Sequence, residues 1–184
     1  MKKIIAIIIS LALLLFGCAK VQVSQDYVEN YQFGDHTSYT WNSELLEENS
    51  GLLSQDELLA DRFKRAIEIV LANQGLQQSD QPDLLVSYVY TVSQMLRSDP
   101  INTGYGFGYG RYGRYTTVGI NGGSVLRQYQ LGMLVIKIYS VRTGHLVWKG
   151  IGTREVYTHA RPEEISTIVN EMVAAVLKQF PPTH

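Results

Sequence analysis

The sequence contains very little cysteine and no excess of basic residues. Cys18 is the single cysteine among 184 residues, so the chain cannot form an internal disulfide even in a compartment that permits one. Sixteen Lys and Arg stand against seventeen Asp and Glu, which gives a formal net charge of -1. Nucleic-acid-binding proteins present a basic surface. The balance therefore argues against a nucleic-acid partner.

Motifs for metal binding and catalysis are also missing. The histidines at 36, 145, 159 and 184 include no pair at the i, i+3 or i+4 spacing of a helical metal site. No Gly-x-Ser-x-Gly nucleophile elbow occurs. Gly108–Gly113 fits the pattern G-x-G-x-x-G, but no helical pattern follows it to bind a phosphate. We expect no metal, no cofactor and no enzymatic activity, with an enzyme whose site the sequence does not reveal as an alternative.

The first 17 residues have the pattern of a bacterial signal peptide. The pair Lys2-Lys3 precedes the apolar run Ile4–Phe16, and the small residue Gly17 stands before Cys18. A helix needs roughly twenty residues to cross a hydrocarbon core of about 30 Å, and this run has about thirteen. We therefore expect cleavage rather than a retained transmembrane anchor.

The end of this segment, Leu15-Phe16-Gly17-Cys18, resembles the bacterial lipobox. The resemblance implies that the peptide is cut before Cys18 and that its thiol is diacylated; an ordinary signal peptide with a chance cysteine is the alternative. Each buried acyl methylene contributes about 0.8 kcal/mol, so two or three chains give long-lived attachment. Ala19 follows where Asp commonly retains lipoproteins in the inner membrane. By that resemblance we expect the outer membrane, facing the periplasm.

Cleavage would leave residues 18–184, a usual length for one domain. Fourteen basic residues would then face seventeen acidic ones, a mildly acidic net charge of about -3. No fixed-period repeat, heptad pattern or second long apolar run occurs. We expect one domain that contacts the membrane through the lipid on Cys18.

Hydrophobic patterning predicts five strands. The expected ranges are 19–29, 37–41, 84–92, 126–139 and 146–157. Gly34-Asp35 suggests a turn between the first two strands, and Arg142-Thr143-Gly144 predicts a hairpin between the last two. In the third strand, alternate residues from Leu84 to Val92 form one apolar face.

Two further segments have the period of an amphipathic helix. The first opens with a capping-box signature at Ser54 and Glu57 and ends at Gly75. The second opens at Pro162 and ends at Pro181-Pro182. These elements predict an α+β fold, an antiparallel or mixed sheet of about five strands with two helices packed on one face. A partly closed barrel is the alternative.

Several segments from Asp26 to the end together resemble the DUF4136 family of bacterial lipoproteins. They are Phe33 with Tyr39-Thr40-Trp41, Pro82–Tyr88, Gly132–Ile136, Thr143–Gly150 and Phe180-Pro181-Pro182. The resemblance implies no activity, because the family has no assigned function. Lys137 stands where the resemblance leads us to expect an acidic residue. Elementary packing explains the tryptophans Trp41 and Trp148 as large buried side chains.

One segment is too rich in glycine for a core and too aromatic for a plain linker. It runs from Gly104 to Tyr115, inside an irregular stretch expected at about 98–123. Tyrosine and arginine are favoured at binding hot spots. The candidate contact residues are Tyr105, Phe107, Tyr109, Arg111, Tyr112, Arg114 and Tyr115. A hairpin extension without a ligand, its rings partly against the sheet, is the alternative.

These observations favour a non-enzymatic envelope lipoprotein that binds an envelope protein or a cell-wall or surface glycan, as an assembly or maintenance factor. A structural lipoprotein without a dedicated ligand is the alternative from a different class.

Overall fold

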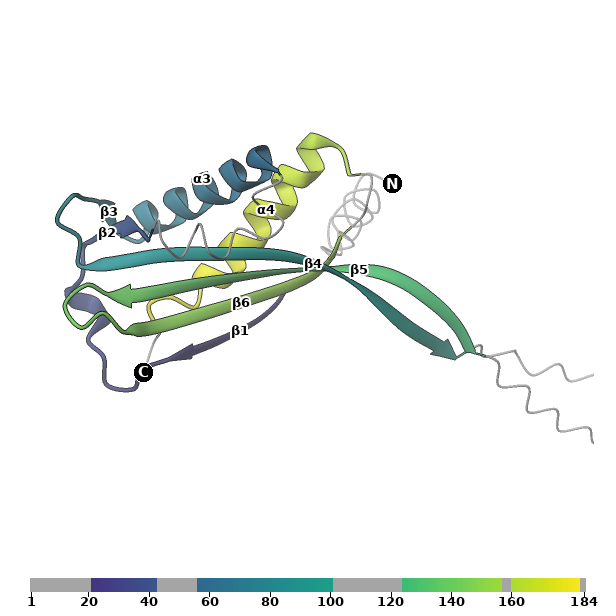
Figure 1. The fold of residues 1–184 in the computed structure, drawn as a ribbon, viewed down its shortest axis with the longest axis horizontal. Helices are drawn as coiled ribbons and strands as arrows, with labels where there is room; N and C mark the ends of the chain where they lie inside the picture. Colours follow the sequence, from purple (N-terminus) through teal and green to yellow (C-terminus); the bar gives the residue numbers. More distant parts are fainter. Residues whose placement is uncertain (1–20, 43–55, 101–123, 157–159, 183–184) are drawn as a thin grey trace, which may run out of the picture.

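The computed structural model describes residues 21–42, 56–100, 124–156 and 160–182 (Figure 1). The elements in chain order are β1 (Gln22–Tyr27), the 3-10 helix η1 (Phe33–Asp35), β2 (Ser38–Trp41), α3 (Glu57–Asn73), β3 (Gln77–Gln78), β4 (Leu84–Pro100), β5 (Ser124–Ser140), β6 (Leu146–Val156) and α4 (Pro162–Leu177). Cys18 and the candidate contact residues between 105 and 115 lie outside the described residues.

The strands form one mixed sheet in the order β1-β6-β5-β4-β2-β3. β2 runs parallel to β3 and β4, and the other neighbours are antiparallel. Both helices lie on the same side of this sheet (Figure 1). The predicted α+β fold is confirmed. The sheet has six strands rather than about five, because the two residues of β3 are too few to produce a periodic pattern.

The first two strands are not paired with each other. β1 lies at one edge of the sheet against β6, whereas β2 lies between β3 and β4. Gly34 and Asp35 fall in η1, within the segment that connects these two sides of the sheet. Phe33 is buried there and packs edge-on against Phe180 at 5.7 Å between ring centroids. The predicted turn is therefore part of a crossing connection, held in place by aromatic packing.

The hydrophobic core lies between the helices and one face of the sheet. The predicted inner face of β4 is confirmed, since Leu84, Val86, Tyr88 and Tyr90 are buried and Val92 is partly buried against them. The buried residues of β5, β6 and the helices include Leu134, Ile136, Ile138, Trp148, Phe63, Ile67, Leu71, Val169, Met172 and Val176. All the described core residues fall between Phe33 and Phe180, so the chain after Cys18 contains the whole of this core.

The helix boundaries follow from local chemistry. The Asp56 side chain caps α3 by accepting from the Leu59 amide at 2.9 Å, so the cap is not at the predicted Ser54. Gly75 ends this helix with φ of 90°, as predicted. α4 begins at Pro162 as expected and has a capping box between Arg161 and Glu164.

Two glycines of β6 allow α4 to approach the sheet closely. A Cβ on Gly150 would overlap the Trp148 ring and lie 2.7 Å from a methyl group of Val176, and one on Gly152 would lie 2.6 Å from Val176. Trp148 itself is fully buried, packs against Phe180 at 5.2 Å and donates from its ring nitrogen to Gln25 Oε1 at 3.0 Å. Gly150 and Trp148 therefore form one packing unit beneath the helix.

β4 and β5 continue far beyond the other strands. They pair from Leu84 with Ser140 to Pro100 with Ser124, whereas β6 ends at Val156, opposite Gln130. Residues 95–100 and 124–129 thus form a two-stranded extension, here called the arm, which projects from the sheet in Figure 1. The strand expected to end at Val92 runs on to Pro100 and includes the first residues of the expected irregular stretch.

Candidate interaction surface

Two hollows on the described surface are largely open to solvent. One is lined by residues 30–35 with Pro181 and Pro182, and the other by Arg154 with residues at the start of α4. Among the described residues, no group of three or more His, Cys, Asp or Glu side chains could hold a metal ion. Within the same ranges, no helix is long and apolar enough to cross a membrane.

A serine, a histidine and an aspartate near the start of β2 have contacts that are structural. Asp83 Oδ2 accepts from the Ser38 hydroxyl at 2.6 Å and from the amides of Ser38 and Thr37 at 3.1 and 3.2 Å. The hydrogen bond from the Ser38 side chain is the main reason that the pKa of Asp83 is lowered, with the Thr37 amide next. The Nε2 of His36 is bonded to the Tyr31 hydroxyl at 2.8 Å. Asp83 thus holds β2 to the start of β4, and Ser38 donates its proton to a carboxylate rather than to a histidine.

The second hollow is lined by charged side chains that hold α4 in place. Arg154 Nη1 lies 2.6 Å from Glu171 Oε2, and this ion pair joins β6 to the helix. Arg154 is largely buried, with 8% of its side chain exposed. At the helix start, hydrogen bonds from the Arg161 side chain and amide lower the pKa of Glu164. The pair of Arg154 with Glu171 serves helix packing and Glu164 serves capping, whereas the buried Nε of Arg154 has no hydrogen-bond partner among the described residues.

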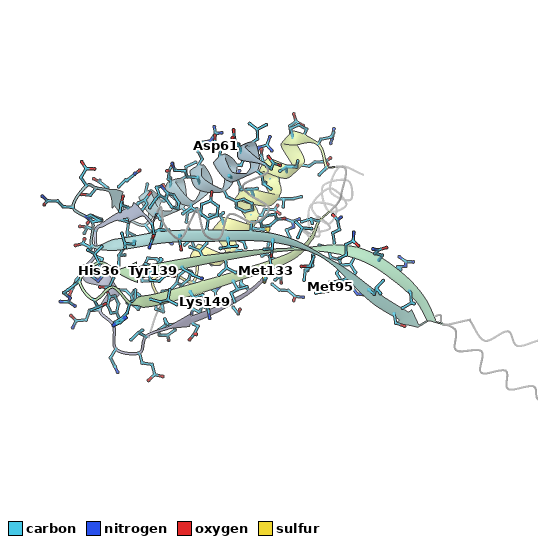
Figure 2. The ribbon with its side chains drawn as sticks, viewed as in Figure 1. His36, Asp61, Met95, Met133, Tyr139 and Lys149 are labelled. Carbon is cyan, nitrogen blue, oxygen red and sulfur yellow. The ribbon has the colours of Figure 1, made fainter. Side chains whose placement is uncertain are left out.

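The sheet face opposite the helices is only half-buried. Its apolar side chains include Leu85, Val89, Leu131, Val135 and Ile151, and none of the described helices or strands covers them. Between them lies a polar row in which Lys137 is opposite Lys149, and Lys149 contacts Asp26 at 3.5 Å. Figure 2 places Tyr139, Met133 and Met95 in that order along the sheet toward the arm.

The arm carries the most exposed aliphatic side chains of the described strands. Leu96 is 71% exposed and Leu126 is 68% exposed. Leu96 is opposite Gln128, and Leu126 comes two residues before Gln128 in β5, so both leucines share one face of the arm. Such residues contribute nothing to the core. Their exposure at the end of an ordered hairpin makes the arm a candidate contact surface.

Polar contacts hold the root of the arm to the sheet. Arg97 lies 2.9 Å from Glu155 at the end of β6 and 4.7 Å from the centre of the Tyr129 ring. On the other face, Gln128 Nε2 donates to Gln94 Oε1 at 2.8 Å. These contacts order the hairpin beyond the end of β6 without burying its leucines.

The seven contact residues predicted from the sequence stay a prediction, because they lie outside the described residues. The arm consists of the two strands that lead into that segment and out of it. The sequence analysis missed Leu96 and Leu126 as surface residues. From Ser93 to Pro100 the sequence has no β-branched or aromatic residue, and the adjacent pair Met95-Leu96 breaks the alternation by which a half-buried strand is recognised.

A family model described as a domain of unknown function, DUF4136, matches residues 23–182. The chain belongs to the DUF4136 family. The match begins within β1 and ends after α4, so the DUF4136 domain and the described fold coincide. The predicted membership is confirmed, and the family description assigns no activity. A comparison with curated proteins finds no match.

A solved structure has the same type of fold. A PDZ domain protein from Parabacteroides distasonis is 15% identical, with a TM-score of 0.55, over 95% of this chain and 40% of that one. The DUF4136 chain therefore spans about two-fifths of that protein, and at this identity the likeness concerns the fold alone. A PelC dodecamer from Paraburkholderia phytofirmans is 13% identical over 90% of this chain and 100% of that one, with a TM-score of 0.39.

Proposed function

We propose that this protein is a non-enzymatic, lipid-anchored envelope protein that binds a partner through its β4–β5 hairpin. The observation that carries the proposal is the arm, a two-stranded extension that projects from the sheet and adds nothing to the core. It leads directly to the segment in which Tyr105, Tyr109, Arg111 and neighbouring aromatic residues have the composition of a binding hot spot. The partner is another envelope protein or a cell-wall or surface glycan.

The anchor is the lipid on Cys18, and the support for it is the sequence Leu15–Cys18 after an apolar run of signal-peptide length. Two or three acyl chains would hold the domain at the membrane, with the outer membrane favoured by Ala19. We expect Cys18→Ala to abolish incorporation of a tagged fatty acid in metabolic labelling. Ala19→Asp is the matched control, because it should keep the label while shifting the protein to the inner membrane on a density gradient. Label retained in Cys18→Ala would contradict the anchor.

The partner is tested by crosslinking in the intact envelope. Replacement of residues 104–115 by a short Gly-Ser connection removes the predicted contact residues and lowers the loop-closure cost slightly. We expect the partners crosslinked to the wild-type protein to disappear, while the thermal unfolding midpoint stays at or above that of the wild type. An unchanged set of partners with unchanged stability would contradict the proposal and favour a structural lipoprotein without a dedicated ligand.

A further inference from the structure

The start of β1 and the root of the arm lie at the same end of the sheet. Gln22 pairs with Thr153, Thr153 with Met133, and Met133 with Thr91. From the level of Thr91, β4 runs nine further residues to Pro100, which at about 3.3 Å per residue is about 30 Å. A lipid on Cys18, four residues before Gln22, would therefore attach at the end from which the arm projects.

The reach of this attachment limits how the arm can point. Four residues extend at most about 14 Å, so Gln22 stays within that distance of an anchored Cys18. In the opposite direction from the arm, β6 runs seven residues from Thr153 to Leu146, about 23 Å of folded sheet. If the arm pointed straight away from the membrane, this sheet would have to fit into a gap of about 14 Å. An arm that points straight away from the bilayer is therefore excluded.

An arm directed straight into the bilayer is excluded by its backbone. Its tip lies about 30 Å beyond the level of Gln22, about twice the length of the tether, so the outer part of the arm would enter the hydrocarbon core. An open two-stranded ribbon has edge amide and carbonyl groups that cannot be satisfied there. An orientation along the membrane surface avoids both conflicts, because water and headgroups can satisfy those groups there.

The side chains of the arm suit such a surface. Leu96 and Leu126 are exposed on one face, which they share with the hydrogen-bonded pair Gln94 and Gln128, while Arg97 lies on the opposite face. Amphipathic segments at an interface bury their apolar side chains about 5 to 10 Å deep, at the boundary between headgroups and acyl chains. We propose that the arm lies along the bilayer that holds Cys18, with Leu96 and Leu126 turned toward the acyl chains. The proposal rests on the lipid anchor of the proposed function.

Quenching by brominated lipids tests this orientation even if cells do not acylate the protein. The chain from Cys18 onward, which holds the entire described core, is coupled through its one thiol to maleimide lipids in phosphatidylethanolamine–phosphatidylglycerol vesicles with brominated acyl chains. Leu96→Trp and Leu126→Trp each add a tryptophan to the arm. Ile69→Trp is the matched control, because Ile69 is 61% exposed on the outer side of α3. Trp41 and Trp148 give the same background in all variants.

We expect the emission added by either arm tryptophan to be blue-shifted and to lose intensity in brominated vesicles, while that of Ile69→Trp is unchanged. Equal quenching at all three positions, or none in the arm, would overturn the proposal; the second result would leave the leucines to a protein partner. Two arm positions are used so that one poorly folded variant does not decide the outcome. Failure of fatty-acid labelling in cells would contradict the anchor alone, whereas failure of quenching with the coupled lipid would contradict the orientation alone.

Discussion

The two ends of the β4–β5 hairpin are built on different principles. In the body, Leu84 of β4 and Leu134 of β5 are completely buried under the helices. In the arm, Leu96 and Leu126 of the same two strands are about 70% exposed, and hydrogen bonds with a few polar contacts maintain the pairing. Packing explains the residues of the body. Packing does not explain the exposed leucines of the arm. The arm is therefore the part of the described structure in which to look for a function.

The same contrast separates residues that matter for folding from residues that matter for contact. The motifs that carry the family resemblance fall mostly in the body: Trp148 and Gly150 pack under α4, and Asp83 holds β2 to β4. They would be required in any protein with this fold. The function of this chain should therefore be sought in residues whose replacement leaves the body stable.

Trp148→Ala should have the largest effect on the body. Its fully buried ring packs against Phe180, and removal of such a ring costs about 3 to 5 kcal/mol. Against a typical total of about 5 to 15 kcal/mol, the loss is severe. Urea unfolding gives the change in free energy, with Leu146→Ala, a partly exposed position in the same strand, as the control. A midpoint close to that of the wild type would show that the ring is not part of the core.

Gly150→Ala should come next. The added methyl group would overlap the Trp148 ring and crowd Val176, and overpacking of this kind costs about 1 to 3 kcal/mol. Gly34→Ala is the matched control, because no atom lies within 4 Å of its added Cβ, and we expect a change within about 0.5 kcal/mol. Equal unfolding free energies for the two variants would mean that α4 does not pack closely on β6.

Asp83→Asn should change how stability depends on pH. Hydrogen bonds, first from the Ser38 side chain, lower the pKa of Asp83 in the folded state, so the carboxylate stabilises the fold above its unfolded pKa of about 3.9. That contribution is lost as the pH falls through the lower folded-state pKa. We expect thermal melts of wild type and variant to differ at neutral pH and to converge in acid. Asp35→Asn is the control. A difference in melting temperature between wild type and Asp83→Asn that stays constant with pH, or an equal pH-dependent difference for Asp35→Asn, would contradict this role.

A smaller effect is expected on the uncovered sheet face. Lys137 lies directly opposite Lys149, and like charges across a strand pair are destabilising. Lys137→Glu should therefore stabilise the domain by about 0.2 to 1 kcal/mol, and the gain should shrink as salt screens the pair. Lys137→Gln removes the repulsion without adding an attraction to Lys149. Comparison of its unfolding free energy with that of Lys137→Glu therefore separates the two contributions. Destabilisation by Lys137→Glu would indicate that Lys137 has another partner on this face.

The body was largely predictable from the sequence because its elements are half-buried. Alternate apolar residues from Leu84 to Tyr90 mark the inner face of β4, and the glycines at 75 and 144 mark turns where φ is positive. The edge position of β1 was not predictable, because its pairing with β6 joins residues about 130 positions apart. Local patterns contain no information on such a pairing.

The arm was missed for the opposite reason. A ribbon exposed on both faces has no buried side to impose alternation, so Met95 and Leu96 can both be apolar without marking a strand. Composition did indicate the segment that follows it, from Gly104 to Tyr115, as a candidate contact region. The length of the strands that lead to that segment became apparent only from their pairing in the structure.

Removal of the arm tests the central claim most directly. Residues 95–129 are replaced by Asn-Gly, a two-residue turn suited to close the hairpin between the paired residues Gln94 and Gln130. The deletion removes none of the described core residues, and the ion pair between Arg97 and Glu155 that it removes is exposed and contributes at most about 1 kcal/mol. We predict that the thermal unfolding midpoint of the truncated protein matches that of the wild type, while its crosslinks in the envelope are lost. A midpoint lowered as far as that of Trp148→Ala would contradict the account, because it would make the arm part of the folded core.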